Sequence, residues 1–430
     1  MGEAHLDIII PTRNAPSALD LTLRSLAIVH PPDEGWTVVV VDDASDPPVA
    51  EVARTFESAL PLRYVQLTSR RGRGGARNAG VAETQGGRLW FIDGDSVVSA
   101  EAMARYSEAC ARREDKIMVG PRHEVNVEQL SRYWRAGVVS QDAADWREMY
   151  GLVTADGAAQ YPLAEWVLVS TCNLFMPRVL FESVGGFDEG LLGWGLEDME
   201  LGYRAVRALG GSPGCVLYEH DAFTLHIPEV KPWAELTNEE TVNYEYIRAK
   251  HKTFEWEALR CDDFVQSSWA IDKYSRCCKE VERDRVGVVV LPELWVLFEA
   301  ATSIVLSGPA VGIPADVAKK IVLRLDVRER GAASLRLFGM WIPLGDDSAD
   351  AAVFIDDWRV LSALDFGRMV REGLRVARRV IVVASQGARE GAGEGVDELL
   401  GIVFENGVEG SIVTEIGCAG TAACVELRRW

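Results

Sequence analysis

The sequence predicts an α/β protein that begins with a doubly wound domain built on a parallel sheet. Short apolar runs recur near the start of the chain, and helical patterns separate them. These runs are rich in aliphatic residues and cover residues 7–10, 36–41 and 88–92. Runs that are apolar on both faces are typical of buried strands in a parallel sheet. Strands of this kind that alternate with helices indicate a doubly wound fold.

The individual elements of the first domain follow from residue spacing. Leu19, Leu23 and Leu26 recur at helical spacing in a segment that begins with the capping residue Ser17. A glycine-rich stretch between a strand and the next apolar run is expected to open another helix. In chain order we expect strands at 7–10, 36–41, 62–67 and 88–92, and helices at 17–29, about 49–58, inside 71–84 and at 100–111.

The rest of the chain is predicted to form a helical bridge and a second, smaller α/β domain. Residues 115–180 are less regular, and an organised block follows at 172–207. Residues 238–284 are charged and helix-prone. Beyond them, alternation returns with strands at 321–326, 352–356 and 379–384 and a helix near 366–377. We therefore expect three parts with boundaries at 1–237, 238–284 and 285–430.

Composition excludes several classes of protein. The 430 residues carry a formal net charge of −20, which argues against a nucleic-acid binder and against docking on an anionic membrane. Residues 1–10 lack a basic start and a cleavage site, so no signal peptide is expected. The longest apolar stretch, 286–313, is interrupted by proline and glutamate, so no transmembrane segment is expected. Eight cysteines without C-x-x-C spacing suggest reduced thiols and a cytoplasmic protein.

Polar side chains gather where the predicted strands end. The strand at 7–10 is followed by Thr12, Arg13 and Asn14, the strand at 36–41 by Asp42 and Asp43, and the strand at 88–92 by Asp93-Gly94-Asp95. Ligands of open α/β sheets bind at the carboxyl ends of the strands. Two carboxylates one residue apart suit Mg²⁺ or Mn²⁺, which would also grip a substrate phosphate. Asp42 and Asp43 alone could equally be turn formers.

A second motif lies at 193–204, where Trp194 between two glycines precedes Glu197 and Asp198. A tryptophan face stacks on sugar rings, and a carboxylate at a helix start can remove a proton from a hydroxyl. The helix N-terminus is expected to help keep Asp198 ionised. About thirty residues later, His226 could complete the coordination of a metal held by Asp95 and a diphosphate, with His220 as the competing candidate.

Together these motifs resemble the family 2 glycosyltransferases, which have the GT-A fold. The sequences PTRN, VDDAS, GGARNAG, DGD, CNLFMPR, GGFDE and GWGLEDMELGYR occur in the family's order within residues 6–230. The resemblance implies transfer of a sugar from a nucleotide-sugar donor, usually UDP-linked, to a glycan or another hydroxyl acceptor, with Mn²⁺ or Mg²⁺ as cofactor. It also implies inversion at the anomeric carbon.

The resemblance assigns roles to particular residues. Asp198 would be the general base, with Glu197 beside it. Trp194, Gly195 and Glu197 would line the acceptor pocket. Asp95, Asp93 and His226 would hold the metal. The nucleotide would be bound by the remaining matched positions, which are Pro11, Thr12, Arg13, Asp43, Arg77, Asp93 and Gly94.

The C-terminal part is similar to class I methyltransferases over 341–356 and 363–384, but the glycine-rich cofactor loop of that family is missing. We therefore expect a degenerate, structural or assembly-forming domain, and a homodimer is plausible on this basis. Two alternatives to a simple glycosyltransferase stay open. One is a bifunctional glycosyltransferase–methyltransferase, which would bind S-adenosylmethionine. The other is a non-catalytic scaffold that binds sugar nucleotides.

Overall fold

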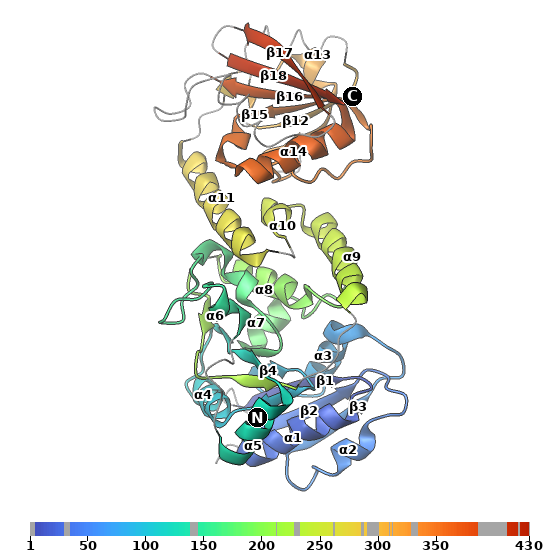
Figure 1. Ribbon diagram of the computed structural model, residues 1–430, viewed down its shortest axis with the longest axis vertical. Helices are drawn as coiled ribbons and strands as arrows, with labels where there is room; N and C mark the ends of the chain where they lie inside the picture. The colour runs from blue at the N-terminus through green and yellow to red at the C-terminus, as the bar shows by residue number, and fades with distance from the viewer. Residues whose placement is uncertain are drawn as a thin grey trace. The chain divides into compact units, whose positions relative to one another are not determined.

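The fold was taken from a computed structural model. It describes residues 5–29, 35–137, 145–211, 213–227, 233–260, 263–284, 288–289, 301–308, 310–311, 313–327, 334–385, 411–419 and 422–429. The chain divides into two compact units, Met1–Tyr246 and Ile247–Trp430 (Figure 1). The boundary lies inside a helix, α9 (Trp233–His251), whereas the sequence placed it at 237 and set a separate bridge after it.

The N-terminal unit is built on a seven-stranded mixed sheet with the order β3-β2-β1-β4-β8-β6-β9. The first four strands in this order are parallel, and β8 runs antiparallel to both of its neighbours. The α/β fold predicted from the sequence is thus confirmed. The strands are β1 (Leu6–Thr12), β2 (Trp36–Asp42), β3 (Leu62–Gln66), β4 (Arg88–Ile92), β6 (Ile117–Val119), β8 (Asn173–Pro177) and β9 (Val216–Tyr218).

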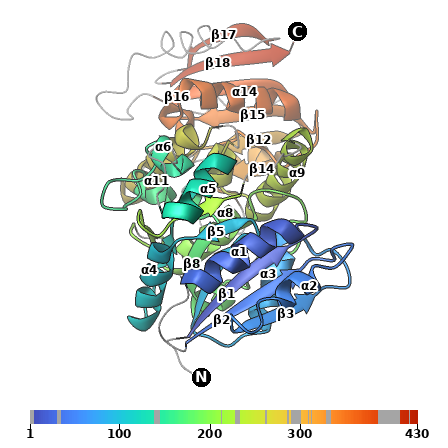
Figure 2. The ribbon, with the colours of Figure 1, turned by 60° about the horizontal axis from the view of Figure 1, so that its bottom comes forward.

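Helices cover both faces of this sheet because the strands are apolar on both faces. Ile8 and Val38 pack in one core with α1 and α4, while Ile9 and Val41 face Gly80 of α3 on the other side. Figure 2 shows α1 lying across the strands β1 and β2. The helices of this unit before α9 are α1 (Pro16–Val29), α2 (Ala50–Arg54), α3 (Gly72–Ala82), α4 (Ala100–Ala111), α5 (Val127–Ala136), α6 (Trp146–Met149), η1 (Pro162–Leu168), α7 (Arg178–Ser183) and α8 (Glu197–Ala208).

A small second sheet stands at the end of β4 and was not predicted from the sequence. It has the order β5-β10-β7, with β5 (Ser96–Val98), β7 (Arg122–Glu124) and β10 (Thr224–His226). His226 in the middle strand is paired with Ser96 on one side and Glu124 on the other. This sheet therefore brings the late histidine next to the Asp93–Asp95 motif.

The C-terminal unit contains a six-stranded sheet with the order β14-β12-β15-β16-β18-β17. Its strands are β12 (Ile304–Ser307), β14 (Ile321–Leu325), β15 (Ala349–Ile355), β16 (Ala377–Ser385), β17 (Ser411–Ala419) and β18 (Ala422–Arg429), and β11 (Val288–Val289) and β13 (Ala310–Val311) pair separately. The helices are α10 (Phe254–Ala258), α11 (Phe264–Asp284), α13 (Ala315–Ala318), η2 (Asp357–Val360) and α14 (Ala363–Val376). The predicted strands and helix are present, and the likeness to methyltransferases stays a prediction.

Glu257 of α10 is held inside the C-terminal unit by backbone groups. Its carboxylate accepts hydrogen bonds from the amides of Phe338, Gly339 and Trp341. Burial nevertheless dominates and raises the pKa of Glu257 to about 7.

Among the described helices, none is both long and apolar enough to cross a membrane.

Candidate active site

The motif residues of the N-terminal unit meet at the carboxyl ends of β1, β2 and β4. Hydrogen bonds hold these strand ends in place: the amide of Asp43 donates to the carbonyl of Thr12 at the end of β1 at 2.9 Å. The hydroxyl of Thr22 in α1 donates to the carbonyl of Gly94 after β4 at 3.0 Å. A β-carbon on Gly94 would lie 2.9 Å from the carbonyl oxygen of Pro11. The Asp93–Asp95 turn therefore packs directly on the end of β1.

The paired aspartates after β2 are both engaged by the protein itself. Asp42 accepts hydrogen bonds from the amides of Ser45 and Val49 and from the hydroxyl of Tyr64. Asp43 accepts from the amides of Arg71 at 2.6 Å and Gly72 at 3.0 Å. Asp43, which the sequence assigned to the nucleotide, thus also fixes the start of α3.

The three predicted nucleotide-binding residues at the end of β1 differ in their exposure to solvent. Pro11 is half-buried and Arg13 is exposed. Thr12 is 6% exposed, and its hydroxyl oxygen makes no hydrogen bond among the described residues. A buried hydroxyl without a partner is costly unless a ligand or water completes it. Thr12 therefore has a hydrogen bond to offer at the place where the nucleotide was predicted.

Asp93 lies between two arginines. Its carboxylate is 2.8 Å from the guanidinium of Arg77 and 3.8 Å from that of Arg122. Burial acts to raise the pKa of Asp93, but the positive charges of Arg77 and Arg122 outweigh it and hold that pKa below its usual value. Asp93 is therefore ionised and committed to two cations of the protein.

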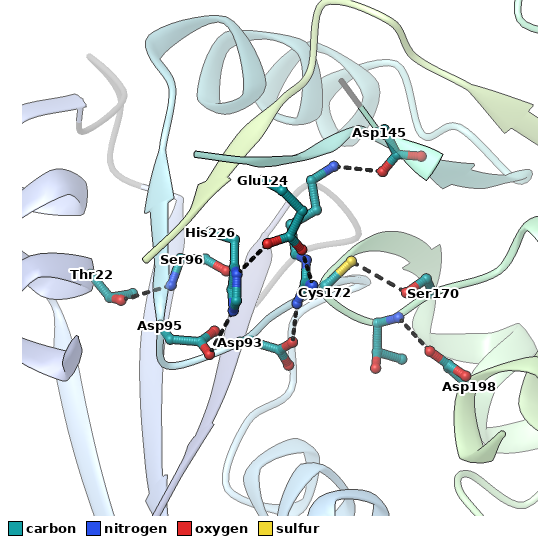
Figure 3. Close-up of polar contacts among 12 residues, drawn as sticks. Thr22, Asp93, Asp95, Ser96, Glu124, Asp145, Ser170, Cys172, Asp198 and His226 are labelled. Carbon is teal, nitrogen blue, oxygen red and sulfur yellow. Dashed lines mark hydrogen bonds and ion pairs between the residues drawn. The ribbon is translucent and has the colours of Figure 1, made fainter. Parts of the chain in front are cut away.

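Asp95, His226 and Glu124 form a line of hydrogen bonds (Figure 3). Nε2 of His226 is 3.2 Å from Oδ2 of Asp95, and Nδ1 is 2.7 Å from Oε2 of Glu124. Burial acts to lower the pKa of His226, but the two carboxylates outweigh it and raise that pKa. The other oxygen of Asp95, Oδ1, is buried and makes no hydrogen bond in the described part of the chain.

These donor atoms fit a hard divalent cation. Asp95 has an unpartnered carboxylate oxygen, and the neighbouring imidazole nitrogen could exchange its proton for a metal ion. A metal-bound histidine usually donates its other N–H to a carboxylate, which is the position of Glu124 here. However, within the described ranges no three His, Cys, Asp or Glu side chains gather closely enough to hold a metal by themselves. Asp93, the third expected ligand, is paired with Arg77 and Arg122.

Glu197 and Asp198 open α8, as the sequence predicted. Asp198 accepts hydrogen bonds from the amides of Met199 at 2.8 Å and Thr171 at 3.4 Å. Burial and then the negative charge of Glu197 raise the pKa of Asp198 to about 6, although Arg77 opposes them. The helix N-terminus was expected to help keep Asp198 ionised; the amide of Met199 does lower this pKa, but burial and Glu197 outweigh it. A carboxylate with this pKa is a stronger base than an ordinary aspartate.

Arg77 was expected to bind the nucleotide, but its side chain is only 1% exposed. The guanidinium contacts Asp93 at 2.8 Å and Glu197 at 3.1 Å. It therefore joins the turn after β4 to the start of α8. We assign Arg77 as a positioning residue in place of a ligand contact.

Helix α9 holds the loop that carries Trp194 and Gly195. The amide of Trp194 donates to Glu239 at 2.7 Å, and Asn243 donates to the carbonyl of Gly195 at 2.8 Å. Glu240 packs against Gly195 as well. Burial and then the charge of Asp198 raise the pKa of Glu240 to about 7. These α9 residues were not predicted from the sequence, because residues 238–284 were assigned to a helical bridge.

The N-terminal part of the chain is similar to known proteins. Residues 7–180 match the model of the family described as glycosyl transferase family 2. Validoxylamine A glucosyltransferase of Streptomyces hygroscopicus subsp. limoneus is 32% identical over 216 residues, which cover 46% of this chain and 47% of that protein. The chondroitin synthase of Escherichia coli is 27% identical over 232 residues, covering 47% of this chain and 32% of that protein.

The match to these relatives is therefore partial. The aligned part spans about half the length of the glucosyltransferase and about a third of the length of the synthase. Among solved structures, Staphylococcus aureus TarS 1–349 in complex with UDP-GlcNAc superposes with a TM-score of 0.46 at 18% identity, over 63% of this chain and 70% of that chain. The family match includes β1, β2, β4 and the Asp93–Asp95 turn, whereas Asp198 and His226 lie beyond its end at residue 180. The N-terminal unit of this chain carries a glycosyl transferase family 2 domain.

Proposed function

We propose that this chain transfers a sugar from a nucleotide-sugar donor, with UDP as the nucleotide, to an acceptor hydroxyl with inversion at the anomeric carbon. The observation that carries the proposal is that one site holds candidate metal ligands and a candidate base at separate positions. Asp95 and His226 offer metal ligands at one end, and Asp198 offers a base at the other. Asp93, Arg77 and Glu197 connect the two ends through ion pairs.

The donor's nucleotide is assigned to the loop after β1 and the turn after β4. Thr12 supports this assignment through its buried, unpartnered hydroxyl. Gly94 supports it because its close approach to the end of β1 leaves no room for a side chain. Pro11 is half-buried and Arg13 is exposed on either side of Thr12, and we assign Arg13 to the diphosphate or ribose of the donor.

Asp95 and His226 would hold Mn²⁺ or Mg²⁺, with the donor's diphosphate and water completing its coordination. When bound, the cation stabilises the negative charge that develops on the departing diphosphate. Asp93 stands beside this pair, where its charge is balanced by Arg77 and Arg122. Hard oxygen ligands and one imidazole suit either cation.

Asp198 is assigned as the general base. Its carboxylate removes the proton from the acceptor hydroxyl, and that oxygen then attacks the anomeric carbon from the side opposite the diphosphate. The new bond forms between the acceptor oxygen and the anomeric carbon. The bond between that carbon and the phosphate oxygen breaks, and the nucleoside diphosphate leaves. Trp194 and Gly195 would form the wall on which the acceptor rests.

The test is binding and slow hydrolysis of a panel of nucleotide sugars, with Mn²⁺ and then with EDTA. Metal-dependent binding of one UDP-sugar supports the proposal and names the donor. A folded protein that binds no donor in the presence of metal would contradict it and would favour the scaffold alternative. Binding of S-adenosylmethionine, measured on the same protein, would decide the bifunctional alternative.

A further inference from the structure

We propose, resting on the proposed function, that Glu124 is a positioning residue that orients His226 toward the metal and restrains Arg122 at the edge of the site. Neither the resemblance nor any sequence motif assigned a role to Glu124. It lies on the three-residue strand β7, directly beside His226 of β10 in the register of the small sheet.

The first part of the argument concerns the imidazole of His226. This residue is 3% exposed, so water cannot easily replace a lost partner. Nδ1 faces Oε2 of Glu124 at 2.7 Å, and a carboxylate there accepts an N–H. A neutral imidazole that donates from Nδ1 must present its lone pair at Nε2, which is the nitrogen beside Asp95. Glu124 therefore selects the tautomer that can bind a metal.

The second part concerns Arg122. Its guanidinium donates to the other oxygen of Glu124 and also lies 3.8 Å from Asp93. The backbone amide of Arg122 donates to Asp145 at 2.9 Å, which fixes the backbone from which the guanidinium extends. Without Glu124, this cation would be free to move onto the carboxylates of Asp93 and Asp95. It would then compete with a divalent cation for the same charge.

Glu124 is suited to a test because its removal should leave the fold intact. Its side chain is 61% exposed, in contrast to the buried imidazole that it holds. Glu128 provides a matched control, because it is an exposed glutamate four residues further on whose side chain contacts Arg132 on the surface of α5. Neither change removes apolar surface from the core.

The experiment measures Mn²⁺ affinity in the presence of UDP by calorimetry and by Mn²⁺ electron paramagnetic resonance, on the full chain. We expect Glu124→Ala to weaken Mn²⁺ binding by about 10- to 100-fold, which is the usual effect of removing the partner of a metal-bound histidine. Glu124→Gln keeps an acceptor for Nδ1–H but not the charge that restrains Arg122, so its loss should be smaller. Glu128→Ala should bind Mn²⁺ as the wild type does, and UDP binding without metal should not change.

Nitrogen-15 NMR of the histidines gives a second readout that a merely structural effect would not move. In the metal-free protein, Glu124→Ala should change the protonation pattern of the His226 ring, while Glu128→Ala should not. Unchanged Mn²⁺ affinity in both Glu124 variants, with a wild type that binds Mn²⁺ and UDP, would overturn the role of Glu124 alone. A wild type that binds UDP but no Mn²⁺ would overturn the proposed metal site and this inference with it.

Discussion

Replacing Arg77 by methionine removes the buried cation that joins Asp93 to Glu197. Both contacts are short, at 2.8 and 3.1 Å, and the arginine side chain is 1% exposed. Breaking a buried ion pair by removing one partner costs about 3–5 kcal/mol, because the remaining charge is left uncompensated. Asp93 keeps a weaker contact with Arg122 at 3.8 Å and is one-quarter exposed. We therefore expect a loss of about 3 kcal/mol for Arg77→Met.

The same change should alter the base. Arg77 lowers the pKa of Asp198, which burial and Glu197 raise to about 6. Without the arginine, that pKa should move higher, so a larger fraction of Asp198 is protonated near neutral pH. The acid limb of kcat/KM should then shift to higher pH. Stability and pH profile thus report the two consequences of one substitution.

Urea unfolding and a pH profile of donor hydrolysis measure these effects. Arg24→Met is the matched control, since Arg24 makes an exposed ion pair with Asp20 that should contribute about 0–1 kcal/mol. The double variant Arg77→Met/Glu197→Gln should recover about half of the lost stability, because it removes one uncompensated charge. If Arg77→Met is as stable as the wild type and its acid limb does not move, the positioning role assigned to Arg77 is refuted.

Three further predictions concern the base, the metal turn and the acceptor loop. The kcat/KM of the wild type should rise through about pH 6 as Asp198 ionises, and Glu197→Gln should move this limb to lower pH because it removes a neighbouring negative charge; an unmoved limb would contradict the electrostatic account. Gly94→Ala should cost about 1–3 kcal/mol of stability in thermal or urea unfolding, because its new methyl group would lie 2.9 Å from a carbonyl oxygen; a neutral effect would show that the turn can yield. Asn243→Ala should raise the acceptor KM about fivefold while donor hydrolysis stays unchanged, since it removes the 2.8 Å bond to Gly195; a loss of donor hydrolysis instead would place α9 in the donor site.

The sequence predicted those parts of the site that lie next to strands. Asp93 and Asp95 follow a run that is apolar on both faces, so their position at the sheet edge could be inferred without coordinates. Glu197 and Asp198 precede a helical pattern, which placed them at a helix start. The contact of His226 with Asp95, 131 residues apart, was expected from the predicted metal site, to which the family resemblance also assigned both residues.

The parts that were missed depend on tertiary contacts. Glu124 lies on a strand of three residues, which is too short to show a period in the sequence. The motif containing Arg77 matched the family, but only the structure shows that its charge is enclosed between two carboxylates. The high pKa of Asp198 arises from burial and from Glu197, and burial at a helix start is not visible in the sequence. Asn243 belongs to a helix whose contacts with the 193–195 loop span 48 residues.

The most direct test of the central claim is the stereochemistry of donor cleavage, because it needs no knowledge of the acceptor. Time-resolved proton NMR would follow the sugar released by water from the α-linked UDP-sugar that binds in the presence of Mn²⁺. Inversion with Asp198 as base predicts that the β-anomer appears first, and that Asp198→Asn slows release by about 10²- to 10⁴-fold. First appearance of the α-anomer, or release at the wild-type rate in Asp198→Asn, would contradict it.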